Sequence, residues 1–130
     1  MDQDLLSIQE ARDLSTRAFE AWKVWSKASQ EQVDRVCAAM AAAAFNAAER
    51  LGQMAHEETG YGVPAHKRLK NEFAAQNVWN SIKDIKTVGV IRHDTEKRIY
   101  EIVWPMGVVA ALIFSTNPTS TVIYKILIAV

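Results

Sequence analysis

The sequence predicts an α/β fold in which helices come first, an antiparallel hairpin follows, and a buried strand leads into a last helix. Three observations support this prediction. Apolar residues recur at steps of three and four before residue 86, and β-branched and aromatic residues gather in residues 87–104. A continuous apolar run, Val108 to Phe114, then precedes a polar turn. Apolar residues at steps of three and four are typical of helices. A short continuous apolar run is typical of a strand that is covered on both faces.

The first predicted helix extends from Leu5 to about Ala28. Its apolar residues recur at helical spacing and include Leu14, Trp22 and Trp25. This spacing places them on one face of the helix, and a globular protein normally buries such a face. We therefore expect Trp22 and Trp25 in the core or in a subunit contact, in preference to stacking on a nucleobase.

An alanine-rich stretch predicts two further helices. Ser29 and Gln32 have the spacing of a capping box, so the second helix should begin at Ser29 and reach about Arg50. A short break is expected before the third segment, Gln53 to Thr59. Cys37, the single cysteine, lies among apolar residues of the second helix, and we interpret it as a packing residue.

Glycine and proline mark the next boundary. The sequence TGYG predicts a loop, and Pro64 suits the first turn of a fourth helix that extends to about Ile82. After it, TVGVIRHD and KRIYEIVWP have the β-branched and aromatic content of two strands, joined at Asp94 to Glu96. An antiparallel hairpin is therefore expected within residues 87–104.

Composition and charge exclude several classes of function. The 15 basic and 15 acidic residues cancel, so no nucleic-acid-binding surface is expected. The apolar runs are shorter than the roughly 20 residues of a membrane span, and the acidic N-terminus does not fit a secretory signal. His56, His66 and His93 fall in separate elements, so no metal site is predicted. These features indicate a cytoplasmic protein that binds small molecules or other proteins.

The polar turn FSTNPTST, between the apolar run and the last helix, is the strongest candidate for a chemical site. A buried strand, a polar turn and a helix N-terminus together open many dinucleotide-binding sheets, although the fingerprint GxGxxG is absent. Pro118 restricts Asn117 to extended backbone conformations and so fixes where its amide points. An amide held in this way can donate to a developing oxyanion. The alternative is an ordinary turn and helix N-cap.

The same residues carry a resemblance to a known family. Pro105 to Val108 and Thr116 to Thr121, in WPMGVVAALIFSTNPTST, resemble the start of the NAD-binding domain of CoA-acylating aldehyde dehydrogenases, including the aldehyde dehydrogenase half of bifunctional alcohol/aldehyde dehydrogenases. SQEQVDRVCAAMAAAA, HEETGYG and KRLKNEFAAQNVWNSIKDIKTVGVI are similar to the family's N-terminal helices and lead-in, so the resemblance covers essentially the whole chain. Hydrolytic relatives usually have proline-tryptophan-asparagine in place of Ser115-Thr116-Asn117, which favours the acylating subgroup.

The resemblance implies an oxidoreductase that converts an aldehyde and coenzyme A to acyl-CoA through a cysteine thiohemiacetal, with hydride transfer to NAD or NADP. It implies that Asn117 holds the reacting oxygen and that Phe114, Ser115 and Thr116 contact the cofactor. The catalytic cysteine would lie beyond this chain. A non-acylating aldehyde dehydrogenase and a non-enzymatic helical interaction module remain as alternatives.

The resemblance also implies a division of the chain and a homo-oligomer. Residues 1–86 would be the N-terminal helical part of a Rossmann-like cofactor-binding domain, and residues 87–104 a hairpin used in oligomerisation. Residues 105–130 would be the first strand, loop and helix of the NAD-binding sheet. The last residues, VIYKILIAV, lack the usual end of a helix, so we expect the front portion of a longer protein.

Overall fold

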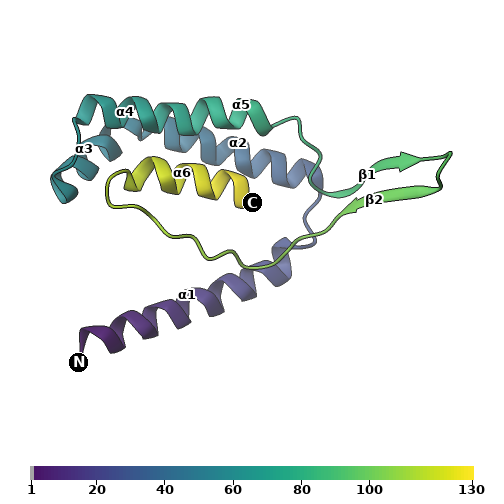
Figure 1. Ribbon diagram of the computed structural model, residues 1–130, viewed down its shortest axis with the longest axis horizontal. Coiled ribbons are helices and arrows are strands. Elements are labelled where there is room, and N and C mark those ends of the chain that lie inside the picture. Colours follow the sequence, from purple (N-terminus) through teal and green to yellow (C-terminus); the bar gives the residue numbers. More distant parts are fainter. Residues whose placement is uncertain (1) are drawn as a thin grey trace. The chain divides into compact units, whose positions relative to one another are not determined.

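A computed structural model describes residues 2–130 of the chain (Figure 1). In chain order its elements are α1 (Gln3–Trp25), α2 (Gln30–Asn46), α3 (Ala48–Thr59), α4 (Pro64–Glu72), the π-helical segment η1 (Phe73–Asn77), α5 (Val78–Ile82), β1 (Gly89–Asp94), β2 (Ile99–Val103) and α6 (Pro118–Ala129). Contacts divide the chain into two compact units. One comprises the chain up to Gln30 with Thr87–Ala110, and the other Glu31–Lys86 with Ala111–Val130. The division into residues 1–86, 87–104 and 105–130 remains a prediction.

In the first unit, α1 confirms the first predicted helix but not its buried face. None of its residues is buried, and Val24 is 77% exposed. Trp22 and Trp25 are half-buried, and the ring of Phe19 stacks on Trp22 with the centroids 5.7 Å apart. The face is not buried by the described residues, and a subunit contact for Trp22 and Trp25 stays a prediction. Helical spacing identifies a face suited to burial, but it does not supply the surface that covers it.

The strands β1 and β2 form the predicted antiparallel hairpin (Figure 1). Pairing extends from Gly89 opposite Val103 to Asp94 opposite Ile99. The Asp94 side chain accepts a hydrogen bond from the backbone N–H of Lys97 at 2.9 Å, which closes the turn. Such a bond from an aspartate to a following backbone N–H is a common way to start a turn.

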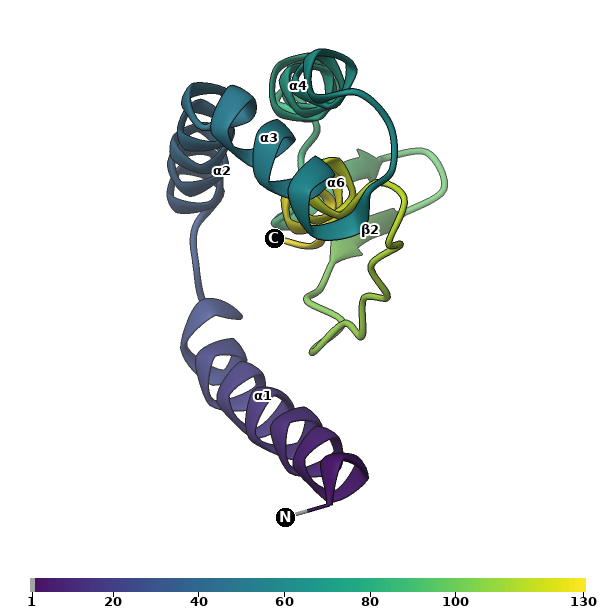
Figure 2. The ribbon, with the colours of Figure 1, turned by 90° about the vertical axis from the view of Figure 1, so that its left-hand side faces the viewer.

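The second unit is built of helices. The segments α4, η1 and α5 form one continuous rod, and α6 lies beside it (Figure 1 and Figure 2). The rod confirms the fourth predicted helix, with Pro64 in its first turn. Small side chains predominate among the buried apolar residues of this unit, which are Val33, Cys37, Ala41, Ala48, Ala55, Ala74, Ala75, Ile123 and Leu127.

The boundary between α2 and α3 lies earlier than the sequence indicated. α2 ends at Asn46 and α3 begins at Ala48, so the break falls at Ala47 and not beyond Arg50. The alanine-rich sequence has no glycine or proline at this point to mark the break, and no side-chain cap begins α3. The end of α3 was predictable, because Gly60 adopts the left-handed conformation (φ 69°) that commonly follows a helix.

The predicted strand from Val108 to Phe114 is absent from the structure. No strand is formed between residues 104 and 117, and Leu112 is 82% exposed. A strand is stable only when its backbone groups pair with a neighbour, and within residues 2–130 the two strands pair only with each other. A strand at Val108 to Phe114 is therefore not confirmed, and the Rossmann-like sheet stays a prediction. The helix predicted after it is confirmed as α6.

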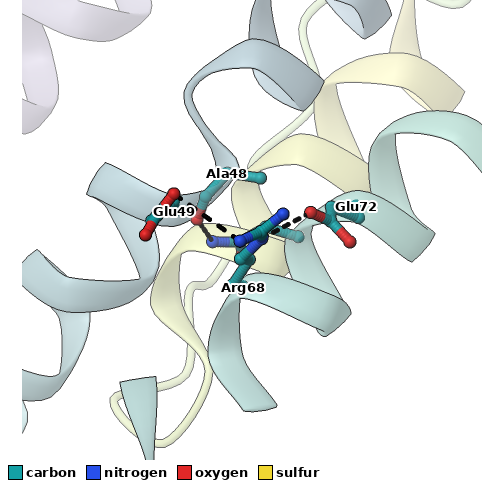
Figure 3. A network of polar contacts seen from close by, with 5 residues as sticks. Ala48, Glu49, Arg68 and Glu72 are labelled. Carbon is teal, nitrogen blue, oxygen red and sulfur yellow. Dashed lines mark hydrogen bonds and ion pairs between the residues drawn. The ribbon is translucent and has the colours of Figure 1, made fainter. Parts of the chain in front are cut away.

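Arg68 joins the exposed surfaces of α3 and α4 (Figure 3). Its Nε donates a hydrogen bond to Glu72 Oε1 at 2.7 Å, and its Nη1 lies 3.6 Å from Glu49 Oε2. The hydrogen bond to Glu72, followed by the charges of Glu72 and Glu49, raises the pKa of Arg68. The guanidinium stays charged and bridges α3 and α4 at their surface, where an exposed ion pair contributes little, while burial supplies most of the stability.

At Gly52 the backbone of α3 lies close against the backbone of α4. A Cβ added at Gly52 would lie 2.8 Å from the backbone N of Arg68 and 3.1 Å from the carbonyl O of Pro64. Both neighbours are backbone atoms, so they cannot rotate away as a flexible side chain would. Only a residue without a Cβ fits this contact.

We expect Gly52→Ala to lower the free energy of unfolding by about 2 kcal/mol, because the clash outweighs the roughly 1 kcal/mol by which alanine is usually favoured over glycine in a helix. Urea denaturation followed by circular dichroism measures the change. Gln53→Ala, at the exposed neighbouring position, should alter stability little. A Gly52→Ala protein as stable as the wild type would contradict the close contact.

Candidate functional site

Three polar residues of α4, Lys67, Lys70 and Asn71, contact the chain around the start of α6. Lys67 and Lys70 contact the loop before α6, residues 115–117, and Asn71 contacts Thr119 in the first turn of α6. The positions i, i+3 and i+4 lie on one face of a helix, so a single turn of α4 can present all three side chains to this segment.

Lys67 is buried, with only 4% of its surface exposed. Its Nζ donates a hydrogen bond to the carbonyl oxygen of Thr116 at 2.9 Å. No ion pair within residues 2–130 includes Lys67. A buried ammonium without a carboxylate depends on the hydrogen bonds that it makes, so this contact ties the Thr116 peptide firmly to α4.

Asn71 is fully buried and connects three helices. Its Nδ2 donates to the carbonyl oxygen of Ala48 in α3 at 3.0 Å. Its Oδ1 accepts a hydrogen bond from the hydroxyl of Thr119, in the first turn of α6, at 2.8 Å. Both ends of the amide are therefore used, as is normal for a buried polar group. Asn71 holds the start of α6 against α3 and α4.

The backbone of Asn117 occupies the N-cap position of α6. Its carbonyl oxygen accepts hydrogen bonds from the backbone N–H of Thr121 at 3.2 Å and from the Thr121 hydroxyl at 2.6 Å. Its φ of −142° is extended, as expected before Pro118, but its ψ of 59° lies outside the predicted range. The hydrogen bonds that begin α6 hold ψ at this value. The Asn117 side chain makes no capping hydrogen bond, so the N-cap alternative does not describe its amide.

The amide of Asn117 is held by its oxygen. Oδ1 accepts a hydrogen bond from Lys70 Nζ at 2.9 Å. Nδ2 makes one long hydrogen bond, 3.4 Å to the hydroxyl of Thr116. The donor end of the amide is therefore only weakly used within residues 2–130, and it can donate to a ligand.

An open groove of about 640 Å³ lies beside this amide, between the rod and α6. Its lining residues are Leu69, Lys70, Phe73, Ala74, Val78, Phe114, Asn117, Ser120, Thr121, Tyr124 and Lys125. The Nζ of Lys125 donates to the carbonyl oxygen of Leu112 at 2.6 Å and lies 5.7 Å from the centre of the Phe114 ring. Mostly apolar walls with a few polar groups are typical of a small-molecule site.

The structure brings two of the four predicted site residues to this groove. Phe114 and Asn117 line it, whereas Ser115 and Thr116 do not. Sequence reasoning missed Lys67, Lys70 and the buried Asn71 altogether. Their only signal in the sequence is their spacing, which places the three polar residues on one helical face. Such spacing is common on exposed helices, so it does not mark a site.

Cys37 is not a candidate nucleophile. It is buried, which confirms the prediction of a packing residue. Burial, and to a lesser extent the charge of Asp34, raises the pKa of the Cys37 thiol above its ordinary value of 9.0. Because the thiolate is the reactive form, the thiol is unreactive at neutral pH.

The described part of the chain contains no group of three or more histidine, cysteine, aspartate or glutamate residues placed to hold a metal ion. None of its helices combines the length and apolar character needed to cross a membrane.

Comparisons with known proteins identify the family. No protein-family model matches the chain. Over 123 residues, 95% of its length, the chain is 37% identical to the bifunctional aldehyde-alcohol dehydrogenase AdhE of Escherichia coli K12. The crystal structure of an acetylating aldehyde dehydrogenase from Geobacillus thermoglucosidasius matches 98% of the chain with a TM-score of 0.96 and 55% identity. The chain is homologous to the N-terminal portion of the acetylating aldehyde dehydrogenases.

A further acetylating aldehyde dehydrogenase supports this assignment. The chain is 38% identical over 110 residues, 85% of its length, to the succinate-semialdehyde dehydrogenase (acetylating) of Clostridium kluyveri. The resemblance inferred from the TNPTST turn is thereby confirmed. The chain spans 14% of the E. coli relative, 24% of the C. kluyveri relative and 28% of the solved acetylating aldehyde dehydrogenase.

Proposed function

We propose that this chain forms part of an oxidoreductase that converts an aldehyde and coenzyme A to an acyl-CoA, with hydride transfer to NAD or NADP. The homology to acetylating aldehyde dehydrogenases supports the reaction class. The observation that carries the proposal is the Asn117 amide beside the groove: its oxygen is held by Lys70, and its nitrogen makes only one long hydrogen bond, to the Thr116 hydroxyl.

Asn117 would stabilise the oxygen of the reacting aldehyde. When a cysteine thiolate attacks the carbonyl carbon, the carbonyl oxygen gains negative charge, and a donor fixed in advance lowers the barrier by roughly 3–4 kcal/mol. Asn117 Nδ2 is the donor that we assign to this role. Cys37 does not suit the attacking role, because it is buried and burial raises the pKa of its thiol, so the proposal assigns the attack to a cysteine outside this chain.

The cofactor residues in the proposal are Phe114, Ser115 and Thr116. They fit such a group, because Phe114 is 65% exposed and Ser115 and Thr116 each carry a hydroxyl group. Aromatic rings and hydroxyl groups are the kinds of side chain that bind the flat rings and ribose of a nucleotide. When bound, the nicotinamide accepts hydride from the reacting carbon. Ser115 and Thr116 do not line the groove, so their contact with the cofactor would lie outside it.

The proposal extends to the fold and assembly of the complete protein. Residues 105–130 would belong to a Rossmann-like cofactor domain, in which Val108 to Phe114 pairs with strands from the remainder of the protein. The hairpin would contact a second copy through apolar side chains that are exposed here, including Ile99, Tyr100 and Ile102. A cytoplasmic location belongs to the same proposal.

The test is an assay of the complete protein with acetaldehyde, sulfoacetaldehyde and succinate semialdehyde, each with NAD or NADP, in the presence and absence of coenzyme A. We expect the reduced cofactor to accumulate together with an acyl-CoA, and only when coenzyme A is present. Equal reduction without coenzyme A, with a carboxylic acid as the product, would indicate the non-acylating alternative. No reduction with any combination would favour a non-enzymatic interaction module.

A further inference from the structure

We infer that Lys70 is a positioning residue for Asn117: its ammonium holds the amide oxygen, so that the amide N–H groups face the reacting oxygen. The catalytic consequence of this contact rests on the proposed function. The contact itself does not, and it can be tested separately.

The chemistry of the two groups determines which way the amide lies. A lysine ammonium only donates hydrogen bonds, and the oxygen of a primary amide only accepts them. With Lys70 Nζ at 2.9 Å from Oδ1, a flipped amide would place its NH₂ group against the ammonium, donor against donor. Lys70 therefore excludes the flipped orientation, in which the oxygen of Asn117 would face a negatively charged ligand.

The backbone on both sides of the pair is also fixed by α4. Lys67, one turn earlier than Lys70, holds the carbonyl oxygen of Thr116 at 2.9 Å. Asn71, next to Lys70, holds the hydroxyl of Thr119 at 2.8 Å. Consecutive contacts from one helical face thus fix the loop before Asn117, its side chain, and the first turn of α6. Because Lys67 and Asn71 are buried, Lys70 extends from a firmly held segment of α4.

A charged partner does more than orient the amide. A hydrogen bond from a cation polarises the C=O group and strengthens the N–H groups of the same amide as donors. A lysine that makes no hydrogen bond to this amide would have no such effect. The inference therefore predicts that the consequence of changing Lys70 depends on whether Asn117 is present.

The kinetic experiment uses the complete enzyme and three single variants. Lys70→Met keeps a side chain of similar length without a donor, and it should lower kcat about tenfold with KM for both cosubstrates nearly unchanged. Lys70→Arg keeps a donor and should recover most of the activity. Lys83→Met makes the same change at an exposed position at the end of α5 and should match the wild type. A wild-type kcat for Lys70→Met would overturn the inference.

A double-mutant cycle separates positioning from an independent effect. In an Asn117→Ala background, Lys70→Met should cause no further loss of kcat, because the group that Lys70 positions is already gone. A second tenfold loss in that background would show that Lys70 acts without Asn117, and the inference would fail.

Crystal structures of the complete protein provide a readout independent of activity. We expect the Lys70 to Asn117 hydrogen bond and one amide orientation in the wild type, and more than one orientation in Lys70→Met. Separation of the two side chains in the wild type would overturn the inference whatever the enzyme does. An intact pair in a protein that oxidises no aldehyde would instead refute the proposed function and leave the positioning contact established.

Discussion

Replacing Asn117 by alanine should lower kcat of the complete enzyme by about 100-fold to 1000-fold. Under the proposed function, this change removes one fixed donor to the charged oxygen, and such a donor is worth roughly 3–4 kcal/mol in the transition state. Cofactor binding should be nearly unchanged, because the bonds that begin α6 go to the backbone oxygen of Asn117, which alanine retains. Steady-state kinetics measure kcat, and a fluorescence titration measures the affinity for NAD or NADP.

Two further variants make the Asn117 result specific. Asn117→Asp has nearly the same shape but replaces the amide donor with a negatively charged acceptor, so it should be at least as slow as Asn117→Ala. Asn46→Ala, at the exposed end of α2, should retain wild-type activity. If Asn117→Ala kept kcat within twofold of the wild type, Asn117 would not be part of the catalytic site.

Replacing Asn71 by alanine should lower the free energy of unfolding by about 3 kcal/mol. The change removes hydrogen bonds to Ala48 and Thr119, leaves the Thr119 hydroxyl without this partner, and opens a cavity at a position with no exposed surface. A lost partner for a buried polar group costs about 1–3 kcal/mol, and the cavity adds to it. Urea denaturation and calorimetry of the complete protein measure the difference.

Two controls test whether the loss of stability in Asn71→Ala comes from its hydrogen bonds or from any asparagine-to-alanine change in this helical segment. Asn77→Ala makes the same substitution at an exposed position of η1 and should change the free energy of unfolding by less than about 0.5 kcal/mol. Combining Asn71→Ala with Thr119→Val should cost less than the sum of the two single changes, since they share one hydrogen bond. Additive losses would mean that the two side chains do not interact.

The parts of the fold that depend on local chemistry were predictable. The loop before Pro64 follows from its glycines, since Gly60 adopts a left-handed conformation that other residues disfavour. The hairpin follows from β-branched residues on either side of an aspartate-containing turn. In both cases the deciding interactions lie within a few residues of one another.

The parts that depend on distant partners were not predictable in the same way. The face of α1 and the segment Val108 to Phe114 both have the composition of buried elements, yet both are exposed in the described residues. Apolar composition shows that burial would be favourable. Whether burial occurs depends on a covering helix or a pairing strand.

The residues of the candidate site also differ in whether their sequence neighbours made them predictable. Asn117 was predictable, because Pro118, the preceding apolar run and the TNPTST turn lie beside it in sequence. Lys70 is 47 residues away from Asn117 and is one of several lysines on exposed helical surfaces, so nothing local distinguishes it. Folding brings the two together by packing α4 against α6.

The sequence by itself determined the family, the order of the helices and the hairpin, and the asparagine at the start of the last helix. Only the tertiary structure decided that Lys70 holds the oxygen of that asparagine's amide, and which residues hold the loop. A sequence motif shows only which residues are neighbours along the chain. The direction of a hydrogen bond depends on which donor the fold places opposite the acceptor.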